Sequence, residues 1–261
     1  MSQFDHDKPQ MADAPHPSND PRRVVILRLQ WLIWLLSKNW LILVNLLSGL
    51  ILLLSVLAPA LLAEGLTSQG QAVYRFLAPH NHQLPQRSYF LFGQAGDLHT
   101  YTIAQLIDAG ADPQRLEPFV GNPEIGFKTA LNQRMMAIFG AIFLGGLIWG
   151  LAGGRPRLDL VLLLLLTLPL LLDGFSHMAS ERSGSGFRDP NGWAVTLTAG
   201  AFPSDFYGGS TLGSLNWWLR TLTGLLFGFG LVWYLYTYLS SRFATVQAKL
   251  EPKLRRAGLI K

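Results

Sequence analysis

Polar side chains that could bind a ligand or do chemistry gather at a few places in a largely apolar sequence. An ionisable residue at membrane depth is costly and normally faces a partner or a cavity, so we expect Asp173 to pair with Arg134 or Arg87. A carboxylate held by arginines keeps its charge and is a poor general base near neutral pH. The cluster is therefore as consistent with an architectural ion pair as with catalysis, and no catalytic residue is assigned. The candidate structural or ligand-site residues are His82, Gln83, Arg87, Ser88, Gln133, Arg134, Asp173 and His177.

Metal binding is a second possibility for the histidines of this cluster. His80 and His82 form a His-x-His pair, and His177 could supply a third ligand. The alternative is that the loop histidines bond only the backbone. The chain has no cysteine, which excludes disulfides and thiolate metal sites. It also lacks a phosphate loop, a dinucleotide fingerprint, a Gly-x-Ser-x-Gly elbow and a His-Glu-x-x-His helix, so a metal is the one cofactor kept open.

The elements that position these residues are membrane helices. Of the 261 residues, 49% are hydrophobic and 14% are charged, well below the roughly 25% charged of soluble domains. Three uncharged runs, 39–63, 135–154 and 221–241, match or exceed the roughly 20 residues that a helix needs to cross a bilayer. A fourth run, 160–172, is shorter, and its helix is expected to continue past Asp173. We predict an all-α membrane protein with four transmembrane helices and a preceding interfacial amphipathic helix. The spans are expected at about 40–63, 135–154, 157–178 and 218–241, with the interfacial helix at 22–38.

The remaining segments are two outer loops and two tails. The loops, 64–134 and 179–217, are expected to contain short helices, one of them capped by Thr102 around Ile103–Asp108. Residues 1–21 are expected to form a disordered cytoplasmic tail. Most lysines and arginines lie before residue 39, at 155–157 and in the basic tail 242–261, which predicts that both termini are cytoplasmic. The basic C-terminal tail is expected to meet anionic lipid heads rather than nucleic acid.

Glycines recur on two of the predicted spans. In lipid, small residues let helices approach closely, so we expect the second and fourth spans to touch. The alternative is that glycine is simply common in membrane helices. The glycines concerned are Gly146, Gly150 and Gly154 in the second span, and Gly224 and Gly228 in the fourth.

Four motifs resemble a family of uncharacterised prokaryotic membrane proteins, the domain of unknown function 2085. Residues 82–88 are similar to its Cys-His-Gln-x-Pro-x-Arg-Ser signature, and 121–128 to its Gly-Asn-x-x-x-Gly-Tyr-Lys stretch. Residues 169–174 and 220–224 are similar to its Pro-x-x-x-Asp-Gly and Arg-x-x-Thr-Gly elements. The resemblance covers roughly residues 40 to 240. It implies a multi-pass protein of a prokaryotic plasma membrane, and it implies no activity.

The chain departs from that family pattern at four positions. Asn81 and Asn132 stand where the family has cysteines, Met135 where it has aspartate, and His177 where it has glutamine. The resemblance implies that the two cysteines work together, as a disulfide or as soft metal ligands, and asparagine replaces neither role. If the family site binds a metal or does redox chemistry, that activity is therefore expected to be lost or changed in this chain.

Two functions remain in view. The first is a non-catalytic accessory subunit of a larger membrane complex, with a membrane-protein partner or a second copy docked on its outer loops and glycine-faced helices. The alternative is a membrane enzyme or a metal- or ligand-binding protein that uses the extracytoplasmic His/Arg/Asp cluster. We favour the first, and no enzymatic activity is assigned.

Overall fold

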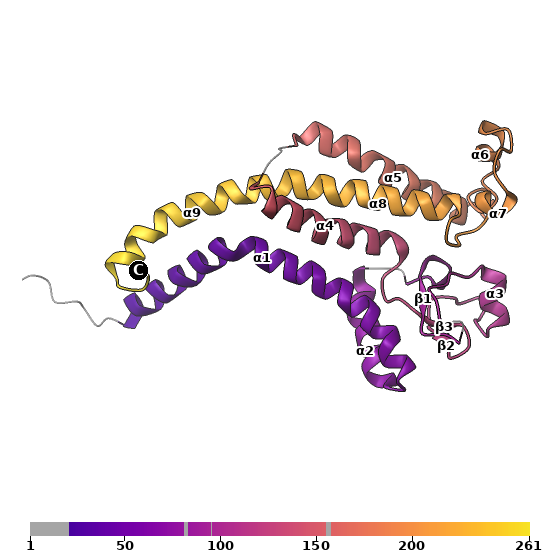
Figure 1. The fold of residues 1–261 in the computed structure, drawn as a ribbon, viewed down its shortest axis with the longest axis horizontal. Coiled ribbons are helices and arrows are strands. Elements are labelled where there is room, and N and C mark those ends of the chain that lie inside the picture. The colour runs from indigo at the N-terminus through magenta and orange to yellow at the C-terminus, as the bar shows by residue number, and fades with distance from the viewer. Residues whose placement is uncertain (1–20, 81–82, 95, 155–157) are drawn as a thin grey trace, which may run out of the picture. The chain divides into compact units, whose positions relative to one another are not determined.

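The computed structural model describes residues 21–80, 83–94, 96–154 and 158–261, and Figure 1 shows it as a predominantly helical chain. Short 3-10 turns occupy Ala78–His80 and Pro85–Arg87. A π-helical turn, Val232–Tyr236, joins α8 to α9. The helices are α1 (Pro21–Ala63), α2 (Thr67–Leu77), α3 (Ile103–Asp108), α4 (Gln133–Leu151), α5 (Leu160–Arg182), α6 (Gly192–Leu197), α7 (Ser204–Tyr207), α8 (Leu215–Leu231) and α9 (Thr237–Arg256), and the strands are β1 (Phe90–Leu91), β2 (Gly121–Asn122) and β3 (Gly126–Lys128).

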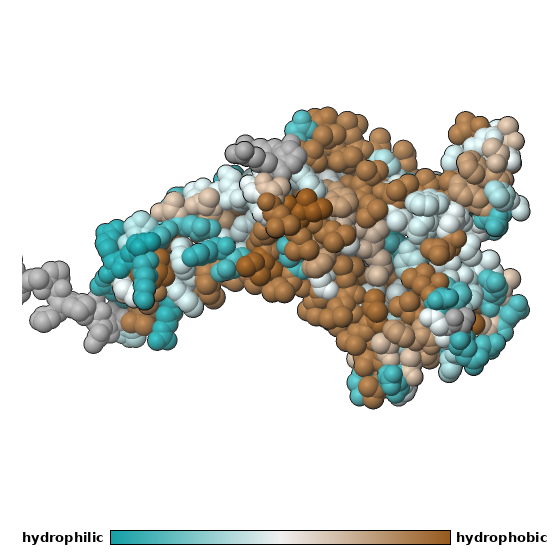
Figure 2. Space-filling model, viewed as in Figure 1, coloured by the Kyte–Doolittle hydropathy of each residue, from teal (hydrophilic) through white to brown (hydrophobic). Residues whose placement is uncertain are grey.

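Four helical segments in the described chain are long and apolar enough to cross a membrane: Pro21–Ala63, Gln133–Leu151, Leu160–Arg182 and Leu215–Arg256. The expected all-α membrane class is therefore confirmed. Figure 2 shows hydrophobic residues over the surfaces of α4 and α5, and hydrophilic residues around α3 and the strands. A surface of this kind suits helices that face lipid tails.

The separate interfacial helix expected at 22–38 is not observed, because α1 continues without a break from Pro21 to Ala63. The polar residues at the expected boundary bond back into the helix. The Ser37 hydroxyl donates to the carbonyl of Trp34 at 2.8 Å, and the Asn39 amide donates to the carbonyl of Leu35 at 2.8 Å. These polar side chains are thus accommodated without interrupting the helix.

The described chain forms two compact units, one within residues 40–241 and one that combines residues 21–39 with 242–261. In the described part of the second unit, the Gln247 amide donates to the carbonyl of Ser37 at 2.8 Å, and Leu254 is fully buried. In the first unit, an aromatic cluster joins three helical segments. The rings of Trp40, Trp149 and Tyr236 pack edge to face with centroids 5.2–6.0 Å apart.

Helix α8 packs against both α4 and α5. A Cβ atom at Gly228 would lie 2.6 Å from the Cβ of Ala141 on α4, and one at Gly224 would lie 3.0 Å from the Cβ of Ala137. On the other side, Gly230 lies against Leu163 and Leu166 of α5. Small residues on α8 therefore bring its backbone close to both neighbours.

The α4 glycines singled out in the sequence do not face α8. Gly146 lies against Asn45 of α1 and Gly150 against Leu41 of α1, whereas Gly154 follows the end of α4 and lies beside Trp149. The face of α4 that meets α8 is instead an i, i+4 ridge of small residues, Ala137, Ala141 and Gly145. One residue of register separates this ridge from the predicted one.

The loop 64–134 contains a small antiparallel sheet as well as the expected short helices. The sheet has the order β1-β3-β2, with Phe90 opposite Lys128 and Gly121 opposite Phe127. Helix α3 begins after Thr102, whose hydroxyl accepts a hydrogen bond from the backbone N–H of Gln105. Phe90 and Leu106 form a small buried core beneath these elements.

Candidate functional site

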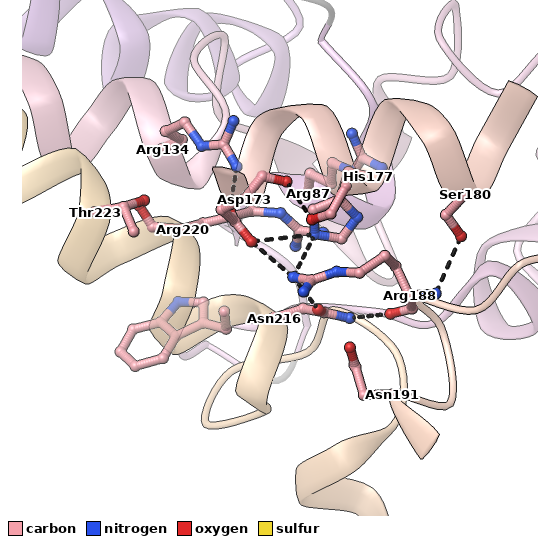
Figure 3. Close-up of polar contacts among 12 residues, drawn as sticks. Arg87, Arg134, Asp173, His177, Ser180, Arg188, Asn191, Asn216, Arg220 and Thr223 are labelled. Carbon is pink, nitrogen blue, oxygen red and sulfur yellow. Dashed lines mark hydrogen bonds and ion pairs between the residues drawn. The ribbon is translucent and has the colours of Figure 1, made fainter. Parts of the chain in front are cut away.

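The cluster is centred on Asp173, which α5 holds 6% exposed at the point where α4, α5 and α8 come together (Figure 3). One carboxylate oxygen pairs with the guanidinium of Arg134, from the first turn of α4. The other accepts a hydrogen bond from Nη2 of Arg188 at 2.6 Å. A buried carboxylate with two charge-assisted partners keeps its negative charge and fixes both guanidinium groups.

Helix capping places these side chains at the helix ends. The Asn132 side chain accepts from the backbone N–H of Met135 at 2.9 Å and so starts α4 immediately before Arg134. Ser214 caps α8 in the same way and places Asn216 and Arg220 in its first turns. Asn132 therefore acts as a helix cap at a position where the resembled family has a cysteine.

Arg188 is the main site residue that the sequence did not reveal. It lies in the loop between α5 and α6, yet its side chain points back into the cluster (Figure 3). Its backbone N–H donates to the Ser180 hydroxyl at 3.0 Å, and the Asn216 amide donates to its carbonyl at 2.7 Å. The one available hint was that Arg182 and Arg188 are the only basic residues of loop 179–217.

His177 lies one turn after Asp173 and accepts from two arginines. Its Nε2 atom lies 3.2 Å from Nη2 of Arg188 and 3.3 Å from Nη2 of Arg220. Guanidinium groups only donate, so Nε2 is the acceptor and the imidazole is neutral, with its proton on Nδ1. Arg220 also donates to the Gln133 side chain at 3.4 Å, and within the described residues it forms no ion pair.

Arg87, the other partner expected for Asp173, pairs with Glu181 instead. Arg87 ends the 3-10 turn Pro85–Arg87, and its side chain meets the last turn of α5 rather than the middle of that helix. Of the two predicted pairs, the structure therefore forms Arg134 with Asp173 and not Arg87 with Asp173.

Gln83 and Ser88 bond to the backbone rather than to the cluster. The Gln83 amide donates to the carbonyls of Tyr74 and Ala130 at 2.8 and 3.2 Å, and the Ser88 hydroxyl donates to the carbonyl of Leu84. Gln133, by contrast, joins the cluster through Arg220.

A buried lysine lies outside this cluster, at the end of β3. The Nζ atom of Lys128 donates to the carbonyls of Gln83 and Glu117 at 2.6 and 2.7 Å, and the side chain is fully buried. Burial lowers the pKa of Lys128 to about 7. The neutral amine, with two N–H groups and two acceptors, fits this environment.

The metal hypothesis gains no support from the described residues. The side chains of His80 and His82 lie outside them, and elsewhere no three His, Asp or Glu side chains gather closely enough to hold a metal ion. The third proposed ligand, His177, points its Nε2 at two guanidinium groups, which repel a cation. The electrostatics of the cluster favour an anion instead.

A cavity of about 660 Å³ opens beside the cluster. The Nε atoms of Arg87 and Arg134, two of its lining residues, are buried and have no acceptor among the described residues. The cavity wall has four arginines against two glutamates. Its lining residues are Leu84, Gln86, Arg87, Ile103, Glu117, Asn132, Arg134, Gly174, His177, Met178, Glu181, Arg182 and Arg220.

Among curated proteins and solved structures, none matches the chain. Residues 125–234 match the model of a family described as "Predicted membrane protein (DUF2085)". The matched segment carries most of the cluster, including Arg134, Asp173, His177, Arg188 and Arg220. The chain is thus a membrane protein that resembles the DUF2085 family across α4, α5 and α8, the helices that build the arginine cluster.

Proposed function

We propose that this membrane protein binds an anionic ligand, through a phosphate or carboxylate group, in the arginine-lined cavity. The observation that carries the proposal is the excess of guanidinium over carboxylate groups around a cavity of about 660 Å³. Cavities of roughly 300–1,000 Å³ are typical of small-molecule sites. With both termini in the cytoplasm, as the lysine and arginine distribution predicts, the cavity faces the extracytoplasmic side.

The positively charged groups of the cluster outnumber its negatively charged groups. Asp173 is already engaged by Arg134 and Arg188, and Glu181 by Arg87. Arg220 is buried and has only neutral acceptors. An anion in the cavity would supply the missing charge, and the planar guanidinium fork matches phosphate and carboxylate oxygens.

Binding is favoured over catalysis, because neither of the two groups that could serve as a general base is available to accept a proton. The Asp173 carboxylate is held charged by two arginines, and the lone pair of His177 Nε2 faces two donors. Neither group is free to accept a proton from a substrate.

Calorimetric titration of the purified protein with inorganic phosphate and with citrate tests the proposal. We expect binding by the wild type, about a tenfold weaker affinity for Arg182→Gln, and a tighter affinity for Glu181→Gln, which frees Arg87. Arg115→Gln removes an exposed arginine outside the cavity and serves as the control. Absence of binding by the wild type, or an equal loss in Arg115→Gln, would contradict the proposal.

A role as an accessory subunit is the second candidate, favoured by the apolar surface of the segment between α5 and α8. Side chains there are exposed although they are large and hydrophobic. Mild-detergent purification of a tagged chain at native expression, with mass spectrometry, should yield a one-to-one membrane-protein partner. The double variant Leu197→Ser with Phe202→Ser should lose it, and a lone monomer would exclude this role. The exposed side chains are Phe187, Trp193, Val195, Leu197, Phe202 and Leu212.

A further inference from the structure

We infer that the anionic group is the head of a lipid-like amphiphile whose apolar chain lies along the exposed face of α5. This inference rests on the proposed function, because it names the class of ligand that the arginine-lined cavity takes.

The wall that α5 contributes to the cavity borders its apolar surface. Gly174, Met178 and Arg182 line the cavity at intervals of four residues, so they share one side of the helix. Leu171, Phe175 and Met178 form a continuous i, i+4, i+7 ridge that ends at Arg182. These three side chains are 44%, 59% and 39% exposed. A chain lying on this ridge would lead directly to the arginines.

The cavity lining is itself amphipathic. Leu84, Ile103 and Met178 contribute apolar walls, and the arginines contribute the charged ones. A small hydrophilic anion would leave the apolar walls unused. A molecule with a charged head and an apolar chain satisfies both, because apolar contacts and charge-assisted hydrogen bonds are made by different parts of the same ligand.

The position of the arginines at the end of a membrane-spanning helix favours the same class of ligand. Charged side chains near hydrocarbon are costly unless a partner compensates them. A lipid head group lies at this depth in the bilayer, and the head of an amphiphile can reach the cavity by moving along the bilayer rather than through water. Gly174 leaves room for the Arg134 guanidinium at the cavity wall, since a Cβ there would lie 3.2 Å from Nη1 of Arg134.

The test compares two ligands that share a phosphate monoester and differ in their chains, dioctanoyl phosphatidic acid and glycerol 3-phosphate. Dioctanoyl phosphatidylcholine controls for partition of the chains into the micelle. Binding to the purified full chain is followed by native mass spectrometry and titration. We expect phosphatidic acid to bind more tightly than glycerol 3-phosphate and phosphatidylcholine.

Matched double variants of α5 identify the role of the ridge. Leu171→Ala with Phe175→Ala should weaken phosphatidic acid binding several-fold and leave glycerol 3-phosphate unchanged. Leu165→Ala with Leu172→Ala removes side chains that are 58% and 61% exposed but lie off the ridge, and should change neither. Arg182→Gln should weaken both phosphate ligands.

The outcomes separate this inference from the proposed function. Equal affinities for the two phosphate ligands, with no effect of the ridge variants, would overturn the amphiphile and leave the anion site standing. Equal losses in the ridge and control doubles would also overturn it, as a general effect on the helix surface. Failure of every phosphate and carboxylate probe to bind would overturn both.

Discussion

Arg188 and Asp173 form a buried ion pair at 2.6 Å that ties the loop after α5 to the membrane helix itself. The side chain of Arg188 is 7% exposed, whereas that of Arg134, the other partner of Asp173, is 23% exposed. The two arginines therefore differ in how well water could solvate them if the carboxylate were lost. This difference decides which second substitution can compensate a change at Asp173.

Asp173→Asn should lower the free energy of unfolding by about 3–5 kcal/mol, because it leaves two guanidinium groups without their counter-charge. Adding Arg188→Gln should restore much of that loss, since the deeply buried charge is removed. Adding Arg134→Gln should restore less, because Arg188 remains buried and unpaired. Denaturant titration in mixed micelles measures all three, and equal rescue by the two arginine changes would contradict this account.

His177→Gln should be tolerated and His177→Leu should not, because Nη2 of Arg220 needs an acceptor at this position. Leucine leaves this buried Arg220 donor unsatisfied, at a cost of about 1–3 kcal/mol, whereas Nη2 of Arg188 still donates to Asp173 and Asn216. The glutamine carbonyl can accept in place of Nε2. Thermal unfolding followed by size-exclusion chromatography distinguishes the two variants, and equal melting temperatures would show that these hydrogen bonds do not matter for stability.

Lys128 should make the protein more stable as the pH rises from 7 to about 9. Burial lowers its pKa in the folded chain to about 7, from an ordinary value of 10.5. In this range the unfolded lysine holds a proton that the folded one has released, so the free energy of unfolding rises by up to about 1.4 kcal/mol per pH unit. The gain is lost as the pH falls through 7.

Lys128→Met should remove this slope relative to the wild type, because no proton is then released on folding. Comparison of the two proteins cancels the titration of other groups, including Tyr74, whose burial raises its pKa and acts in the opposite direction at higher pH. Parallel stability curves for wild type and variant would mean that Lys128 stays charged when folded.

Gly228→Ala should destabilise the bundle by about 1–3 kcal/mol, because the added Cβ would lie 2.6 Å from the Cβ of Ala141 and 2.7 Å from the carbonyl of Ile138. Gly140→Ala is the matched control. It adds the same atom to α4 at a place with no neighbour within 4 Å among the described residues. Unfolding in mixed micelles should separate the two, and similar values would indicate that α4 and α8 can move apart at no cost.

Local patterns were sufficient for the parts of the fold that depend on a single segment. Three long uncharged runs, and a shorter one continued past Asp173, predicted the four membrane helices, and the Thr102 cap predicted α3. The cost of a charge in the membrane also predicted that Asp173 has an arginine partner. Each of these follows from the solvation of one segment or one side chain.

Contacts between segments that are distant in the sequence could not be predicted from local patterns. The strands β1, β2 and β3 have only two or three residues, which is too short for an alternating pattern, and β1 pairs with a segment more than thirty residues away. The helix face that meets α8 contains Gly145 rather than Gly146, a difference of about 100° around α4. Spacing alone does not say which neighbour a small residue faces.

The sequence by itself determined that this chain is a membrane protein, because the transfer of long apolar runs into lipid depends only on composition and length. The tertiary structure decided the character of the site. It brought Arg188 from a loop and Arg220 from another helix to face His177, and it paired Arg87 with Glu181. These contacts depend on how three helix ends and a loop pack together, and the resulting excess of positive charge around one cavity is a property of that packing.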